Sequence, residues 1–476
     1  MRARIFAEEN RKWWTLGAVA FGLFMIMLDN TVVNVALPSI QRDLHISVEE
    51  LEWIVNGYAL TFAVLMLTGG KLADLLGRRL IFVAGLAIFT ASSLACGLAD
   101  SAAMLIGARV VQGVGAALMN PATLSIITAT FPPRQRGMAI GIWAGVSAMA
   151  LAIGPLVGGI LAEKISWGWI FFINVPVGIL GIVVARLVIT ESRDTSQEQR
   201  LDLPGLAASA VGLFALTYAL IEANNYGWTS ARILSLFAVA VAGLAVFVLL
   251  ETRQRVPMLD VSLFKNPTFA GANLVMLMIA LAMFGVFFYV SIFMQNVMGY
   301  SAIQAGASFL PMTLLITIVA PIAGKRSDAV GSRWLMAAGM TLLGLSLVVF
   351  SRLDPGDGFW NLFPGLVLGG IGMGLSMTPT TAAVMGSVQV DKAGVGSAVL
   401  NSMRQVGGSL GIALMGAIVL SYAQPAGASV PDPAGFVTGF HRALLVAAGI
   451  AFSAAVVAIA TVRRVRSPEA VVAELA

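Results

Sequence analysis

The sequence predicts an all-α polytopic membrane protein, and three observations support this. Of the 476 residues, 58% are hydrophobic and only 11% are charged, a balance that soluble globular domains do not show. Apolar stretches long enough to cross a bilayer recur to the C-terminal end. The basic residues lie in the short connections between these stretches, so the net charge of +5 indicates orientation in a membrane rather than nucleic-acid binding.

Fourteen membrane-spanning helices are expected, each an apolar stretch bounded by a polar or Gly/Pro-containing connection. The first lacks a small-residue cleavage site, so we expect it to remain as a helix rather than be removed as a signal peptide. The fourteen stretches lie near residues 14–37, 51–70, 80–99, 102–127, 138–162, 167–189, 203–221, 232–250, 268–294, 303–324, 334–351, 360–385, 396–421 and 438–462.

Alternate connections differ sharply in basic charge. One set holds 23 Lys and Arg residues and the other holds five, while Arg109 lies inside a helix. The positive-inside rule places the richer set, with both termini, in the cytoplasm, which requires an even number of helices. We therefore expect a multi-pass protein of the cell inner (plasma) membrane. The single cysteine, Cys96, excludes a disulfide within one chain.

The chain contains an internal repeat. GKLADLLGRR at 70–79 returns as GKRSDAVGSR at 324–333, and MNPAT at 119–123 is echoed by MTPTT at 377–381. Related halves with a binding site near the membrane midplane are typical of secondary transporters.

The repeat predicts three parts. Residues 1–190 form an N-terminal six-helix half, 191–255 a linker with two inserted helices, and 256–476 a C-terminal six-helix half. The amphipathic segment 257–267 is expected along the cytoplasmic interface.

Asp29 is a carboxylate within the first apolar stretch. A charge at that depth costs roughly 2.5–3.5 kcal/mol, so a functional role, such as carrying a proton, is expected. Arg109 has the same expected depth, because each residue lies nine positions from the outer end of its helix, roughly 13 Å. Separating the two would favour protonation of Asp29, whereas a static ion pair is the alternative. Both histidines lie in polar connections, so Asp29 is the obvious proton site, with one proton per cycle.

Two glycine-containing motifs suggest moving or closely packed parts. In GGKLADLLGRR, glycines permit a tight turn, basic residues hold it in the cytoplasm, and Asp74 is expected to accept hydrogen bonds from Arg79 or a neighbouring helix N-terminus. Simple topology marking is the alternative. GPLVGG predicts a kinked helix that packs closely. The residues of this turn and its repeat are Gly70, Lys71, Asp74, Gly77, Arg78, Arg79, Lys325, Asp328 and Arg333, and those of GPLVGG are Gly154, Pro155, Gly158 and Gly159.

Five segments together resemble a known family. LDNTVVNVALP (28–38), GGKLADLLGRR (69–79), RVVQGVGAALMNPA (109–122), GPLVGG (154–159) and WIFFINVPVG (169–178) resemble the signature segments of the major facilitator superfamily, and more narrowly of its fourteen-helix drug:proton antiporter branch. The resemblance covers the whole chain. It implies proton coupling through Asp29 and Arg109, a cytoplasmic latch in the second segment and antiport from the fourth.

A substrate site is expected near the midplane between the halves. Met and aromatic side chains form adaptable apolar surfaces, and a few amides add polar contacts. In the family that this chain resembles, some exporters of dications carry acids in the helices corresponding to 303–324 and 396–421. This chain has no acid there, which favours neutral or singly charged substrates. The candidates are Phe24, Met25, Asn30, Asn34, Gln112, Asn120, Phe284, Phe288, Tyr289 and Gln295.

The expected function is proton-driven efflux of lipophilic neutral or monocationic compounds by alternating access. We expect a functional monomer that uses the proton gradient and needs no cofactor or metal. The alternatives are a narrow exporter of one natural product, metabolite or lipid, a proton-coupled importer, and a channel or scaffold. Catalysis is not expected, because GGSLG at 407–411 lies in an apolar helix away from any histidine and no phosphate-binding GxxxxGK[ST] occurs.

Overall fold

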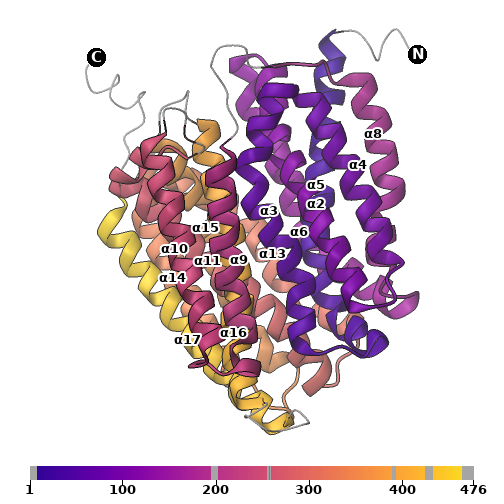
Figure 1. Ribbon diagram of the computed structural model, residues 1–476, viewed down its shortest axis with the longest axis vertical. Helices are drawn as coiled ribbons and strands as arrows, with labels where there is room; N and C mark the ends of the chain where they lie inside the picture. The colour runs from indigo at the N-terminus through magenta and orange to yellow at the C-terminus, as the bar shows by residue number, and fades with distance from the viewer. Residues whose placement is uncertain are drawn as a thin grey trace. The chain divides into compact units, whose positions relative to one another are not determined.

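The computed structural model describes residues 8–193, 202–254, 257, 259–388, 393–423 and 432–463. All regular structure in these residues is helical (Figure 1). The helices are α2 (Glu8–Leu44), α3 (Val48–Leu76), α4 (Arg78–Gly97), α5 (Ala102–Thr130), α6 (Pro133–Lys164), α7 (Trp169–Phe172), α8 (Asn174–Val188), α9 (Leu203–Tyr226), α10 (Ala231–Arg253), η1 (Val261–Lys265), α11 (Pro267–Ile292), η2 (Phe293–Val297), α12 (Ala302–Ser308), α13 (Leu310–Val330), α14 (Ser332–Phe350), α15 (Phe359–Gly386), α16 (Ala393–Ala423) and α17 (Pro433–Thr461).

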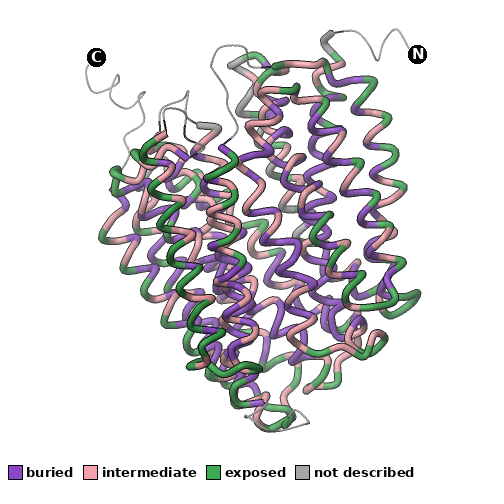
Figure 2. The backbone as a smooth tube through the Cα atoms, viewed as in Figure 1, coloured by how far each residue is buried: buried purple, intermediate pink, exposed green. Residues whose placement is uncertain are grey.

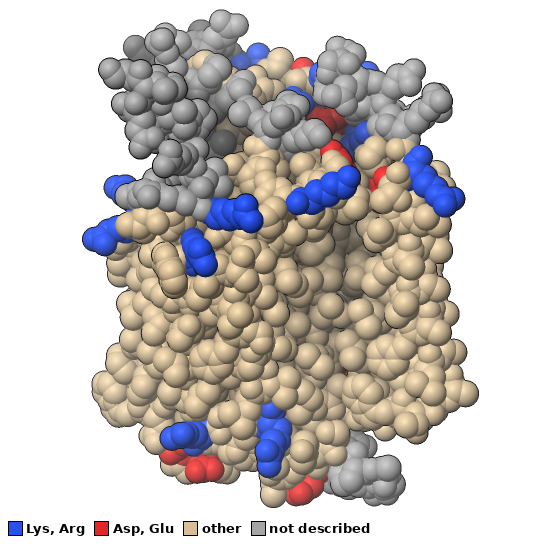
Figure 3. Space-filling model, turned by 90° about the vertical axis from the view of Figure 1, so that its left-hand side faces the viewer, with Lys and Arg blue, Asp and Glu red and all other residues tan. Residues whose placement is uncertain are grey.

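The predicted all-α polytopic class is confirmed. Within the described residues, thirteen spans are long and apolar enough to cross a membrane, and α6 covers the remaining expected stretch, 138–162. Apolar side chains such as Val241 and Leu249 are exposed on α10, and few residues of this helix are buried within the protein (Figure 2). On the face drawn in Figure 3, Lys and Arg lie near the two ends, and the band between carries no charged side chains. This is the surface expected of helices surrounded by lipid.

The chain folds into two compact units. Unit 1 comprises Met1–Leu216, Ala238–Met258 and Met294–Ala307, and unit 2 comprises Thr217–Phe237, Leu259–Phe293 and Ser308–Ala476. In unit 1, α5 packs along α3 and α4, α2 along α6, and α4 against α8. In unit 2, α15 packs along α13 and α14, α11 along α16, and α14 against α17. The two sets of pairings match in the order of the sequence repeat.

Some observed helices differ from the expected ones near prolines. The first helix was expected to end near Leu37, but α2 continues through Pro38 to Leu44. The stretches 167–189 and 303–324 are each interrupted, once between α7 and α8 and once between α12 and α13. Pro176 and Pro311 lie in the first turn of the helix after each interruption, where a missing backbone N–H costs little.

Short elements and glycines complete the packing. The expected interfacial segment contains the 3-10 helix η1, whose first turn is capped by the Asp260 carboxylate, which accepts from the N–H of Ser262 at 3.1 Å.

Within unit 1, the inserted helices α9 and α10 approach closely at Gly212 and Gly243. A Cβ at Gly212 would lie 2.9 Å from the backbone nitrogen of Leu244. Small residues permit this backbone contact.

Candidate functional site

A buried three-residue cluster joins α2 to α5. The Arg109 guanidinium donates from Nη1 to Asp29 Oδ2 at 2.6 Å and to Gln112 Oε1 at 2.7 Å. Gln112 Nε2 donates to Asp29 Oδ1 at 2.9 Å. None of the three residues is more than 1% exposed. Both carboxylate oxygens therefore accept a hydrogen bond, which a buried carboxylate requires to remain charged.

Helix α3 fixes the position of the guanidinium. Arg109 Nε donates to the backbone carbonyl of Ile54 at 3.2 Å, and its Cζ lies 4.2 Å from the centre of the Tyr58 ring. The second aromatic ring beside it is that of Phe171, at 5.7 Å. The cation is thus held by a carbonyl, a carboxylate, an amide and two aromatic rings, which together replace its hydration.

Two features of this region were not part of the sequence prediction. Gln112 was expected to contact substrate, but both of its amide atoms are used within the cluster. In addition, Glu52 of α3 is a second carboxylate that is fully buried. Glu52 lies among acidic residues at the start of a helix, a pattern typical of an exposed first turn, so its burial is not evident from the pattern of residues.

The GPLVGG motif of α6 packs against α2 just beyond Asp29. A Cβ at Gly154 would overlap the hydroxyl of Thr31, and one at Gly158 would lie 2.7 Å from the carbonyl oxygen of Val32. Only glycine permits this approach, so the motif sets the position of the α2 turn that carries the carboxylate.

The outer side of the same motif packs against α12 within unit 1. A Cβ at Gly159 would lie 2.5 Å from the Ala302 carbonyl oxygen, and one at Gly306 would overlap the Pro155 carbonyl. One turn beyond, Glu163 Oε2 accepts a hydrogen bond from the backbone N–H of Ile303 at 2.9 Å. Hydrogen bonds from Ser301 and from Ile303 lower the pKa of the Glu163 carboxyl.

The first latch motif uses a different acid from the one expected. Asp74 pairs with Arg78, four residues on, at 3.0 Å, and not with Arg79. The chain turns at Gly77, with φ +123°, and the carboxylate of Glu191 accepts from the backbone N–H groups of Arg79 at 3.0 Å and Leu80 at 3.1 Å. Glu191 thus caps the N-terminus of α4 and fills the space that a Cβ at Gly77 would occupy.

The repeated latch keeps the same backbone turn. Gly331, the counterpart of Gly77, has φ +85°. The guanidinium of Arg333 lies 5.3 Å from the centre of the Trp334 ring, and Lys325 is exposed. The side chain of Asp328 lies outside the described residues. Gly70 and Lys71 of the first latch are half-buried in α3, where a Cβ at Gly70 would contact Pro121.

The expected pocket residues of unit 1 have mixed surroundings. Asn30 and Asn34 donate to backbone carbonyls of their own helix, from Nδ2 to Ile26 and Asn30 respectively. Phe24 is half-buried, and Met25 and Asn120 are buried. Gln295 Nε2, from η2, donates to the carbonyl of Val35 in α2 at 2.9 Å.

The expected pocket residues of unit 2 lie on α11. Phe284 is half-buried and packs against Gly408 of α16. Phe288 and Tyr289 are fully buried, with ring centres 4.9 Å apart.

Known structures share this fold. A bacterial homologue of the human lysosomal transporter Spinster, crystallised in an inward-facing, unoccupied conformation, aligns with TM-score 0.69 and 18% identity, covering 96% of this chain and 99% of that one. A mutant of the peptide transporter POT, in complex with sulfate, aligns with TM-score 0.66 and 16% identity, over 92% and 93% of the two chains.

Several resistance proteins are closer in sequence. The tetracenomycin C resistance and export protein of Streptomyces glaucescens is 37% identical over 87% of this chain and 77% of its own. The methylenomycin A resistance protein of Streptomyces coelicolor is 38% identical over 85% of each chain. The multidrug resistance protein Stp of Mycobacterium tuberculosis is 36% identical over 88% of this chain and 79% of its own.

The family model described as the Major Facilitator Superfamily matches residues 19–412, and a second match covers 316–474. The first match alone spans most of the chain, including α2 with Asp29 and α5 with Arg109 and Gln112. With its fold, its signature segments and these relatives, this chain belongs to the Major Facilitator Superfamily.

Proposed function

We propose that this protein exports lipophilic small molecules, neutral or singly charged, in exchange for protons. The observation that carries this proposal is the buried cluster of Asp29, Arg109 and Gln112, a titratable group with its own charge-balancing partner inside the membrane-spanning part. The named activities of the relatives, antibiotic export and multidrug resistance, support the substrate class.

The cluster provides a physical route for coupling. While Arg109 and Gln112 donate to both oxygens, the carboxylate of Asp29 is stabilised in its charged form. Moving the guanidinium away leaves a charge in an apolar interior, where binding a proton is favoured. A substrate that displaces Arg109 therefore promotes protonation, and deprotonation restores the pair. The proposed exchange uses the Asp29 carboxylate alone and therefore carries one proton per cycle.

The glycine contacts of α6 provide the mechanical part of the proposal. Gly154 and Gly158 hold α6 against α2 beside the cluster, so a shift of one helix displaces the other. Packed backbones have few intermediate arrangements, which suits alternation between two states. The latch turns at Gly77 and Gly331 are proposed to open and close the cytoplasmic side.

The protein is further proposed to act as a monomer in the plasma membrane. The basic connections favour a cytoplasmic location for both termini of this plasma-membrane protein. Each chain contains the complete cluster, so a monomer is sufficient. The proton gradient supplies the energy, with no cofactor and no catalytic chemistry.

Transport in inverted membrane vesicles tests the proposal. Vesicles with the wild-type chain should accumulate lipophilic dyes when a proton gradient is imposed and lose them when an ionophore collapses it. Asp29→Asn should abolish gradient-driven uptake, whereas Asp43→Asn, an exposed aspartate at the end of the same helix, should leave it unchanged. Full gradient-driven transport by Asp29→Asn would refute the coupling role.

A narrower substrate range is the second candidate. Three relatives are named for single antibiotics: tetracenomycin C, methylenomycin A and puromycin. A panel of unrelated dyes and antibiotics separates the two candidates, because a multidrug exporter transports several chemical classes and a narrow exporter only one.

A further inference from the structure

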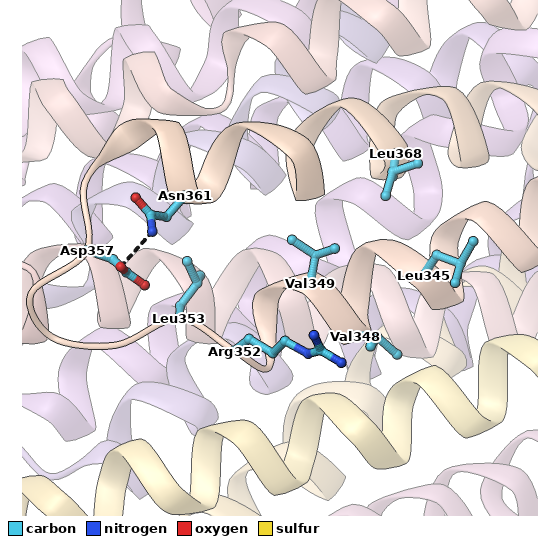
Figure 4. A pocket seen from close by; sticks show the side chains of 8 residues that line it. All are labelled: Leu345, Val348, Val349, Arg352, Leu353, Asp357, Asn361 and Leu368. Carbon is cyan, nitrogen blue, oxygen red and sulfur yellow. Dashed lines mark hydrogen bonds between the residues drawn. The ribbon is translucent and has the colours of Figure 1, made fainter.

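The connection between α14 and α15 forms the rim of an open groove in unit 2. The groove has a volume of about 400 Å³, within the range of about 300–1,000 Å³ typical of ligand sites. Figure 4 shows Asp357 and Asn361 at the end nearest the connection and Leu345 and Leu368 at the other end. One end is therefore polar and the other apolar, and the Arg352 guanidinium lies between them, beside Val348.

The sequence repeat shows that this rim is an addition to one half. The first repeated segment recurs after 254 residues, at Gly70 and Gly324, and the second after 258, at Met119 and Met377. The four extra residues fall between these segments, where the structure has the connection that contains Arg352 and Asp357. The corresponding connection between α4 and α5 is shorter and lacks a basic residue.

Two opposite charges are available at the rim. Within the described part of the chain, neither Arg352 nor Asp357 takes part in an ion pair. Asp357 is held by Asn361, which donates from Nδ2 to Oδ1 at 2.7 Å, and by the backbone N–H of Asp354 at 2.8 Å. Each carboxylate oxygen retains a lone pair for a further donor.

Aromatic residues place the rim at the depth of lipid headgroups. Phe359, Trp360 and Phe363 form a cluster with ring centres 5.5–5.8 Å apart at the start of α15. Trp360 is 76% exposed. Exposed aromatic clusters of this kind lie at the membrane–water interface, so the groove descends from the headgroup region into hydrocarbon.

We propose that this groove binds one phospholipid with a zwitterionic, primary-amine headgroup, of the phosphoethanolamine type. The Arg352 guanidinium binds the phosphate, for which its planar donors are suited. The Asp357 carboxylate accepts hydrogen bonds from the ammonium, and an acyl chain lies along Val348, Val349 and Leu368. A trimethylammonium group carries a positive charge but no N–H, and a glycerol headgroup donates from hydroxyls but carries no positive charge, so only a primary ammonium offers Asp357 both.

Native mass spectrometry of the delipidated full chain tests this site. Phosphatidylethanolamine, phosphatidylcholine and phosphatidylglycerol with identical acyl chains would be added singly and in competition. We expect the wild type to retain one phosphatidylethanolamine about tenfold more than either other lipid, which corresponds to about 1.4 kcal/mol. Equal retention of the three lipids, or preference for phosphatidylglycerol, would overturn the proposal.

Variants assign the two charges separately. Arg352→Gln should lower retention of all three lipids about tenfold, whereas Asp357→Asn should retain lipid but lose the preference for ethanolamine over choline. Arg442→Gln, an exposed arginine of α17 outside the groove, is the matched control and should behave as the wild type. Val349→Trp fills the groove without changing charge and should remove the bound lipid. Thermal melting of each variant checks folding, and equal loss in Arg442→Gln would contradict a specific site.

Discussion

At the scale of single residues, the charge of Asp29 is balanced by two donors that lie three positions apart on α5. Arg109 and Gln112 are neighbours on one face of that helix, and each bonds a different carboxylate oxygen. The arrangement is rigid while intact, because Ile54 and Tyr58 also hold the guanidinium. It is sensitive to the loss of either Asp29 or Arg109, because the other charge would then be buried alone.

The first prediction separates the stability of this pair from its function. Arg109→Gln should lower the free energy of unfolding by about 3–5 kcal/mol, because it leaves the Asp29 carboxylate uncompensated. The double variant Asp29→Asn/Arg109→Gln should recover most of that stability but no proton-driven transport. Thermal melting in detergent and vesicle uptake measure the two effects, and a single variant as stable as the wild type would contradict the prediction.

The second prediction concerns pH and Glu163, which lies just beyond the expected span 138–162. Its pKa is lowered in the folded protein by hydrogen bonds from Ser301 and Ile303. In the unfolded chain the pKa of this carboxyl is near 4.5, and in the folded protein it is lower. The hydrogen bonds therefore stabilise the folded protein at pH values above 4.5. This stabilisation is lost as the pH falls through the pKa of the folded state. Glu163→Gln should therefore melt slightly below the wild type, by a constant amount from about pH 7 to about pH 5.5, and the difference should shrink in stronger acid.

Because Glu163 is largely exposed, the expected difference in melting temperature is small. Asp43→Asn provides a control with an exposed carboxylate on another helix. A difference that grew on acidification would show that the carboxylate is not stabilised by these donors.

At the scale of elements, α6 is positioned by glycines whose missing side chains allow backbone contact. Gly158 faces Val32 of α2, whereas Gly145 of the same helix faces open space, where an added Cβ would have no atom within 4 Å. Substituting Ala at each position therefore adds the same methyl group, against the α2 backbone at Gly158 and into open space at Gly145.

The third prediction uses this pair. Gly158→Ala should destabilise the protein by about 1–3 kcal/mol and reduce transport, because the added methyl overlaps the α2 backbone. Gly145→Ala should leave transport unchanged and be neutral or stabilising by about 0.5–1 kcal/mol, the usual helix preference for Ala over Gly. Similar effects of both changes on melting and uptake would argue against a packing role for Gly158.

At the scale of the whole molecule, charge in the connections and apolar length in the helices determine how the chain crosses the membrane. The fourth prediction tests this orientation by labelling single cysteines in a Cys96→Ser background. Asp354→Cys should react with a membrane-impermeant maleimide on intact cells, because the connection between α14 and α15 is expected outside. Lys325→Cys should react only after the cells are permeabilised, and the reverse pattern would invert the topology.

Much of the fold was predictable because it depends on local properties. Apolar length sets each helix, and the repeat at 70–79 and 324–333 predicted related sets of helices, which the pairings within the two units share. Helix ends were less predictable, since Pro38 lies inside α2 whereas Pro311 lies in the first turn of α13. Whether a proline ends or bends a helix depends on whether neighbouring groups can hydrogen-bond the backbone carbonyl that it leaves unpaired. The order of residues along the chain does not show which groups those are.

Positions within the apolar stretches predicted that Asp29 and Arg109 share a depth, and the structure joins the two directly although α2 continues past the expected end to Leu44. Other contacts became evident only from the folded chain: Gln112 closes the cluster, and at the start of α4 it is Glu191, not Asp74, that accepts from the backbone N–H of Arg79. Such contacts join residues far apart in the chain, as in the 112 positions between Arg79 and Glu191. Their geometry depends on how helices rotate and pack against one another, which the apolar pattern of a membrane helix constrains weakly because both lipid and protein interior are apolar.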